Sequence, residues 1–186
     1  MVGLVHLLIP IVLAAVLVFV ASSVIHMFLG YHNSDYREPP NEDAIMDALR
    51  VLPPGDYMFP CGRGDMAYMK SEEYKAKVVK GPVGVMTILP PNETGNVGPQ
   101  LLHWFVFCLV VSLFTACVGN LGLERGAEYM TVFTITGFAA FGFYGLSIWE
   151  NSIWYKLAWS TTLKRTLDAV IYGLLTAGVF GWLWPV

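Results

Sequence analysis

Four stretches of the chain are long, apolar and almost free of charged side chains. They run from about 4 to 29, 101 to 121, 129 to 147 and 167 to 184. A helix rises about 1.5 Å per residue, so about 20 apolar residues cross a hydrocarbon layer of ~30 Å. A backbone in lipid must satisfy its own hydrogen bonds, and these runs are too uniformly apolar for barrel strands. The sequence therefore predicts an all-α integral membrane protein with four transmembrane helices.

The few charged residues predict how such helices are oriented. Charged residues make up 13% of the chain, against about 25% in a typical soluble domain. Of the 11 Lys and Arg residues, only Arg125 lies outside the connection after the first run and the connection after the third. By the positive-inside rule, those two connections face the cytoplasm and both termini lie outside it. We expect a multi-pass protein of a bacterial cell (inner) membrane. No basic surface for nucleic acid is present.

The first apolar run favours a retained helix over a cleaved signal peptide. No Lys or Arg precedes residues 4–29, and the run exceeds a signal-peptide core of about 7–15 residues. We therefore divide the chain into a transmembrane helix at 1–30, a cytoplasmic insertion at 31–99 and transmembrane helices 2–4 at 100–186. An aromatic loop at 149–163 is predicted to lie along the membrane surface, because Trp and Tyr settle at headgroup level.

The insertion has the sequence pattern of a small α+β unit. Asn41 precedes an acidic turn and is the predicted cap of a helix, and a second helix is predicted from Ser71 to Lys80. Residues 57–59 and 83–89 are predicted to be extended. Units below about 40–70 residues rarely build an independent core. We expect the insertion to pack on the spans or on another subunit.

Small residues recur along two of the predicted transmembrane helices. On the fourth they form a continuous stripe: Ala169, Gly173, Ala177 and Gly181. The third carries Ala139, Gly142 and Gly145. Lipid gives helices no hydrophobic reason to associate, so close backbone approach along small residues supplies the contact energy. The pattern predicts tight helix packing, either within the chain or against another subunit.

Histidines near the predicted membrane boundary are the candidate ligands. His26 ends the first helix and His103 begins the second, so they lie at similar depth on antiparallel neighbours. One imidazole from each of two helices is the arrangement of a bis-histidine haem. A metal site would draw on His26, His32, His103 and Cys61, whose side chains suit zinc or copper. Their spacing matches no known ligand pattern.

Asp168 is the candidate polar group for a transport path. An ionisable residue at membrane depth indicates function by default. Lys164 and Arg165 lie one helical turn before Asp168, so a local ion pair is the simpler explanation.

Catalytic motifs are absent from the sequence: there is no nucleophile elbow, phosphate loop or pair of intramembrane carboxylates. We therefore expect a non-enzymatic accessory or scaffolding subunit of a membrane protein complex. Its partners would be the lipid bilayer and other membrane subunits or further copies of the chain. No cofactor is expected on this interpretation. The two alternatives are a haem- or metal-binding electron-transfer subunit and a small transporter.

Overall fold

The computed structural model describes residues 2–91 and 95–186. Within these residues, four helical segments are long and apolar enough to cross a membrane, as the sequence predicts. Their bounds are Leu4–Met27, Gly98–Gly122, Tyr129–Trp154 and Trp159–Leu183. The first comprises the 3₁₀ helix η1 (Leu4–Leu7) and α1 (Leu8–Met27), the second is α5 (Gly98–Gly122), and the fourth is α8 (Trp159–Leu183). The third joins α6 (Tyr129–Gly145), η4 (Leu146–Ile148) and α7 (Trp149–Trp154).

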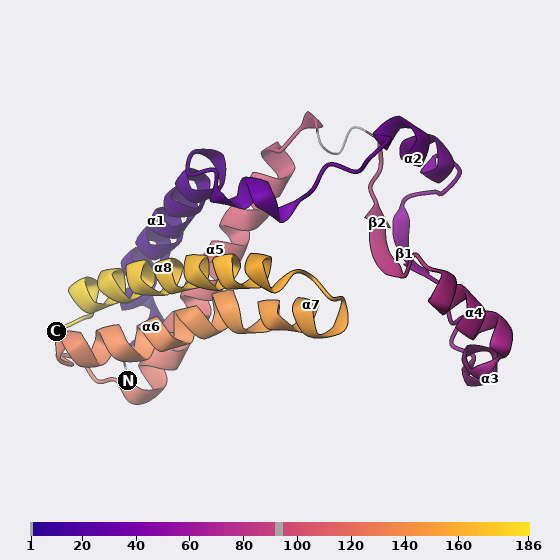
Figure 1. Cartoon of the computed structure of the whole chain (residues 1–186). Helices are drawn as coiled ribbons and strands as arrows, with labels where there is room; N and C mark the ends of the chain where they lie inside the picture. The colour runs from indigo at the N-terminus through magenta and orange to yellow at the C-terminus, as the bar shows by residue number, and fades with distance from the viewer. Residues whose placement is uncertain (1, 92–94) are drawn as a thin grey trace. The chain divides into compact units, whose positions relative to one another are not determined.

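The chain forms two compact units, which we describe separately. One holds residues 1–37 and 98–186, and the other holds residues 38–97. In the first unit α6 and α8 lie side by side along most of their length, and α1 packs against both α5 and α8 (Figure 1). A 3₁₀ helix, η2 (Tyr31–Asp35), follows α1 and returns to contact α8. The first unit therefore brings the start of the chain against its last helix.

The small-residue stripe of α8 is used inside the chain, against α6. A Cβ added at Gly173 would lie 3.2 Å from the carbonyl oxygen of Gly137, and one at Gly145 would lie 2.8 Å from the Cβ of Ala169. At the far end, a Cβ on Gly181 would meet the Tyr129 ring at 2.7 Å. The two backbones approach each other this closely only because these positions lack side chains.

The remaining predicted small residues contribute less to that contact. Ala177 does face α6, with its Cβ 3.1 Å from the Cβ position of Gly137. A Cβ on Gly142 would meet only Leu146 of the same helical segment, at 3.8 Å, and Ala139 is half-buried. The third span therefore approaches α8 through Gly137, Phe141 and Gly145, rather than through the whole predicted set.

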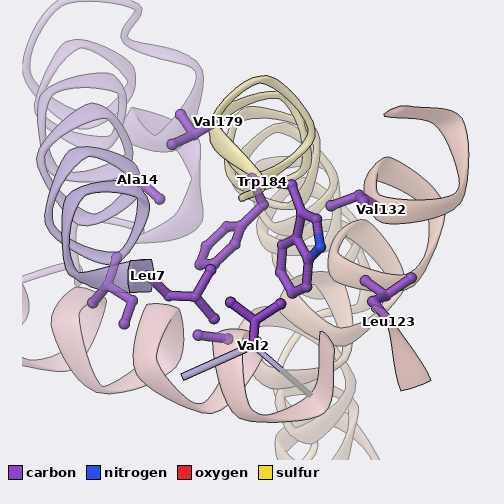
Figure 2. Packing of buried hydrophobic residues seen from close by; sticks show 10 residues of the cluster. Val2, Leu7, Ala14, Leu123, Val132, Val179 and Trp184 are labelled. Carbon is purple, nitrogen blue, oxygen red and sulfur yellow. The ribbon is translucent and has the colours of Figure 1, made fainter. Parts of the chain in front are cut away.

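An apolar cluster closes the end of the four-helix unit where the two termini lie (Figures 1 and 2). Val2, Leu7, Phe180 and Trp184 are all less than a tenth exposed. The Val2 main-chain N–H donates to Asn120 at 2.6 Å, so the chain start is hydrogen-bonded to α5. Among the residues that the structure describes, apolar packing and hydrogen bonds hold this end without any buried charge.

The second unit has secondary structure, but none of its described residues is buried. Strands β1 (Gly55–Phe59) and β2 (Gly84–Ile88) pair antiparallel, with Tyr57 opposite Met86, which confirms the two predicted extended segments. Three short helices accompany them: α2 (Glu42–Leu49), α3 (Met66–Lys70) and α4 (Glu72–Lys80). Across residues 38–91 and 95–97, no side chain is classed as fully buried.

Two details of the insertion test predicted helix starts. Ser71 caps α4 by accepting a hydrogen bond from the Tyr74 N–H at 3.2 Å. Asn41 does occupy the N-cap position of α2, as predicted, but its side chain makes no capping hydrogen bond, because Asn41 adopts a left-handed backbone with φ 53°. A capping side chain requires an extended backbone at that position, which carries its oxygen over the first turn.

The aromatic segment predicted as a loop at 149–163 is largely helical. Only residues 155–158 separate α7 from α8. Ser152 and Thr162 are both buried and share a hydrogen bond of 2.5 Å between their hydroxyls. This hydrogen bond joins α7 to α8, and α8 begins at Trp159 instead of near Leu167.

Candidate functional site

Asp168 is a buried carboxylate in α8, well inside the fourth span, with 3% of its surface exposed. Two groups of η2 bind it: the Tyr31 hydroxyl donates to Oδ1, and Nε2 of His32 lies 2.9 Å from Oδ2. The predicted local ion pair with Lys164 or Arg165 is not formed. The partner instead comes from 136 residues earlier in the chain.

His32 lies between two carboxylates. Its Nε2 faces Asp168, and its Nδ1 lies 2.7 Å from Oδ2 of Asp35. Ionised carboxylates can only accept hydrogen bonds, and a neutral imidazole carries only one N–H. Each ring nitrogen of His32 therefore lies within hydrogen-bonding distance of one carboxylate.

Lys164 fixes the second carboxylate. Its Nζ lies 2.7 Å from Oδ1 of Asp35, and it also donates to the main-chain oxygen of Tyr31 at 2.7 Å. Burial alone would raise the pKa of Asp35, but the hydrogen bonds from His32 and Lys164 outweigh it and hold that pKa below its ordinary value of 3.8. Asp35 is therefore ionised at neutral pH.

The Tyr31 hydroxyl stays protonated at neutral pH. Burial, the hydrogen bond to Asp168 and the nearby charges of Asp168 and Asp35 all raise the pKa of its hydroxyl. A phenol that keeps its proton can only donate to a carboxylate. This hydrogen bond holds Oδ1 of Asp168 in a fixed orientation.

His26, at the end of α1, stacks on His32. The two rings lie 4.5 Å apart between centroids and 7° from parallel. The His26 Nδ1 lies 3.0 Å from the carbonyl oxygen of Ser22. A carbonyl only accepts, so Nδ1 carries the proton and Nε2 of a neutral ring keeps a free lone pair. His26 therefore has one nitrogen oriented by the backbone and one available as a ligand.

His26, His32 and Asp168 form a cluster of three groups able to hold a metal ion. One ligand atom from each lies within 4.8 Å of the others. Two imidazoles and a carboxylate suit zinc, and they also match the ligand set of non-haem iron(II) sites. Each ligand already has an oriented partner: Ser22 for His26, Asp35 for His32 and Tyr31 for Asp168. We refer to these three ligands as the His–His–Asp cluster.

A pocket of about 440 Å³ adjoins the cluster and receives residues from all four spans. His26 and Asp168 line it, together with Arg165. The remaining walls are largely apolar or aromatic: Met27, Leu101, Trp104, Tyr144, Ile148, Ala169 and Tyr172, with Ser22 and Ser23. The Trp104 indole N–H donates to the Ser22 hydroxyl at 2.7 Å, so the wall from α5 is bound to α1.

The structure separates the predicted ligands into two groups. His26 and His32 lie together, whereas His103 is exposed on α5, outside the cluster. Trp104, the next residue, lines the pocket, and one residue on a helix corresponds to a turn of about 100°. Cys61 is an exposed free thiol in the second unit.

Three functional residues were not predicted from the sequence: Tyr31, Asp35 and Ser22. Tyr31, His32 and Asp35 share one short segment after the first apolar run, and such a dense group of polar side chains at a membrane boundary was the available signal. Ser22 acts through its main-chain oxygen, which no side-chain pattern reveals.

No family model, curated protein or solved structure matches the chain.

Proposed function

We propose that the chain is an integral membrane protein of the bacterial cell membrane that binds a divalent transition metal ion at His26, His32 and Asp168. The charge pattern supports an orientation with residues 38–97 in the cytoplasm. Labelling of the exposed Cys61 by a membrane-impermeant thiol reagent tests that orientation. Labelling from outside intact cells would show the opposite orientation.

The observation that carries the metal proposal is the second layer of hydrogen bonds around the ligands. Metal-binding histidines usually donate their other N–H to a carbonyl or carboxylate, which sets the ring orientation. His26 does so to Ser22 and His32 to Asp35. A purely structural ion pair between His32 and Asp168 would not need an oriented second imidazole beside it.

The ligand set favours zinc among common metals. Zinc sites with three protein ligands from His and carboxylate side chains keep a further position open. Metal binding requires a proton-free Nε2 on His32, so uptake should release protons. The parallel stacking of the two imidazoles must also change, since both rings then direct a nitrogen at one ion.

Metal titration of the purified, chelator-treated chain tests this proposal. We expect one Zn²⁺ or Co²⁺ per chain by calorimetry, with visible absorption of bound Co²⁺ and release of protons. His32→Ala and Asp168→Asn should abolish binding, because each removes a ligand. Asp35→Asn should weaken it about 10-fold, the lower end of the effect of second-layer partners.

His103→Ala is the matched control, since His103 is exposed and outside the cluster. It should bind metal as the parent chain does. Equal binding by His32→Ala would refute the proposal, and a haem band lost in His103→Ala would favour the bis-histidine alternative. Zinc uptake into liposomes containing the chain would extend the function to transport.

The insertion supports a second candidate function, that of an accessory subunit. Residues 38–91 and 95–97 contain no fully buried side chain, and a two-stranded sheet is marginal without a covering surface. A partner subunit would supply that surface. Isolation from native membranes in mild detergent should then yield a protein in fixed stoichiometry that is lost when residues 38–97 are replaced by a linker.

A further inference from the structure

We propose that the pocket beside the His–His–Asp cluster binds a single-chain amphiphile with a carboxylate head, that is, a fatty acid, which meets the metal ion and Arg165. The inference rests on the proposed metal site and adds the class of molecule that this site receives. It follows from which residues the pocket shares with the cluster, from their charges and from the lining of the rest of the pocket.

The pocket and the cluster share two ligands, His26 and Asp168. Three protein ligands leave a zinc-type ion with at least one position for another molecule. A molecule that fills the pocket therefore lies beside the ion. The volume, about 440 Å³, is in the range of small-molecule sites, about 300–1,000 Å³.

The charges favour an anionic head. In the network, Asp35 contacts both His32 and Lys164, and Asp168 contacts His32. A divalent ion held by the cluster would add positive charge beside the pocket. Arg165 adds another cation to the pocket wall, and no carboxylate among the described residues forms an ion pair with it. Guanidinium groups bind carboxylates through paired, charge-assisted hydrogen bonds.

The other walls favour an alkyl chain. Met27 and Leu101 line the pocket with 68% and 37% of their surfaces exposed, and both lie at the ends of spanning helices. Exposed apolar side chains on such helices face lipid. The pocket thus joins a cationic, metal-binding end to an apolar rim, and this combination matches a molecule with one charge and one hydrocarbon tail.

The Co²⁺-loaded full chain in a non-ionic detergent, titrated with decanoate, tests the inference. Decanoate should change the visible spectrum of bound Co²⁺, because a carboxylate oxygen enters the coordination sphere. Decanol and acetate are the matched probes, the first without the charge and the second without the tail. We expect neither to reproduce the change at the same concentration.

Two variants locate the binding. Arg165→Gln should keep Co²⁺ affinity and bind decanoate about tenfold more weakly, whereas Lys156→Gln, which alters a lysine outside the pocket, should match the parent chain. Leu101→Trp should block decanoate and leave Co²⁺ bound, since Leu101 is a rim residue of α5.

The outcomes separate the two proposals. A chain that binds no Co²⁺ refutes the metal site itself. A chain that binds Co²⁺ with a spectrum unaffected by decanoate refutes the fatty-acid inference alone. An equal response to decanol also overturns it, because the carboxylate head would play no part, and an equal response to acetate would show the same of the tail. An Arg165→Gln chain that responds as the parent does would show that the arginine plays no part.

Discussion

The two ends of the four-helix unit are held together by different means. Where the termini meet, Val2, Leu7, Phe180 and Trp184 pack into an apolar cluster (Figure 2). At the other end, the pair of His32 and Asp168 joins η2 to α8. Apolar packing stabilises without a desolvation penalty, whereas a buried ion pair rarely stabilises more than apolar residues would. We therefore expect the apolar end to contribute more to stability than the charged end.

The largest effect should come from the apolar end. Phe180→Ala removes a side chain with no exposed surface and should lower the free energy of unfolding by about 3–5 kcal/mol. Metal affinity should stay unchanged, because the cluster lies at the opposite end of the unit. Unfolding in mixed micelles with increasing SDS measures the free energy of unfolding, and Co²⁺ titration measures the metal affinity. Phe138→Ala, at a side chain that is 74% exposed, is the control. A parallel loss of metal binding would show that the two ends are coupled.

A smaller effect should follow from crowding the contact between α6 and α8. Gly145→Ala places a Cβ 2.8 Å from that of Ala169, so the helices must separate, at a cost of about 1–3 kcal/mol. Gly178→Ala, on the same pair of helices, meets nothing within 4 Å and should be neutral or slightly stabilising. The same unfolding assay compares them. Because Ala169 follows Asp168, Gly145→Ala should also weaken Co²⁺ binding, and unaltered binding would show that the cluster tolerates movement of α8.

The smallest effect should be the pH dependence of the charged end. The pKa of Asp35 is lower in the folded chain than its ordinary 3.8, so its contribution to stability is complete above that pH and is lost as the pH falls through the lowered value. Asp35→Asn should therefore flatten the acid limb of a stability–pH curve. Tyr31 acts in the opposite direction, since its raised pKa makes its contribution complete below pH 10.0 and lost as the pH rises above it. Identical acid limbs in the parent chain and in Asp35→Asn would show that another group titrates there.

The sequence was sufficient to predict elements whose evidence is local. Apolar runs predicted the four helices, because span length depends only on consecutive residues. Ser71 and Lys80 bounded a helix through their immediate neighbours. The start of α8 was missed because Lys164 and Arg165 end the apolar run near Leu167, whereas the helix itself extends back to Trp159.

The candidate site depends on two quantities that a sequence does not show. One is the angle around a helix axis, which places Trp104 in the pocket and leaves His103 exposed. Depth along the axis, the basis of the predicted His26–His103 pair, does not fix that angle. The other quantity is long-range pairing. Lys164 and Asp168 are one turn apart, yet each binds a residue of η2 instead of the other.

The pairing of His32 with Asp168 also has a consequence for how the protein is made. The two residues are 136 positions apart, and translation adds about 5–20 residues per second. Roughly 7 to 27 s therefore pass between synthesis of the histidine and of its aspartate, by the same rate. During that interval the nascent chain carries His26 and His32 without their partner from α8. Any metal available to the nascent chain before α8 emerges would meet only two of the three proposed ligands.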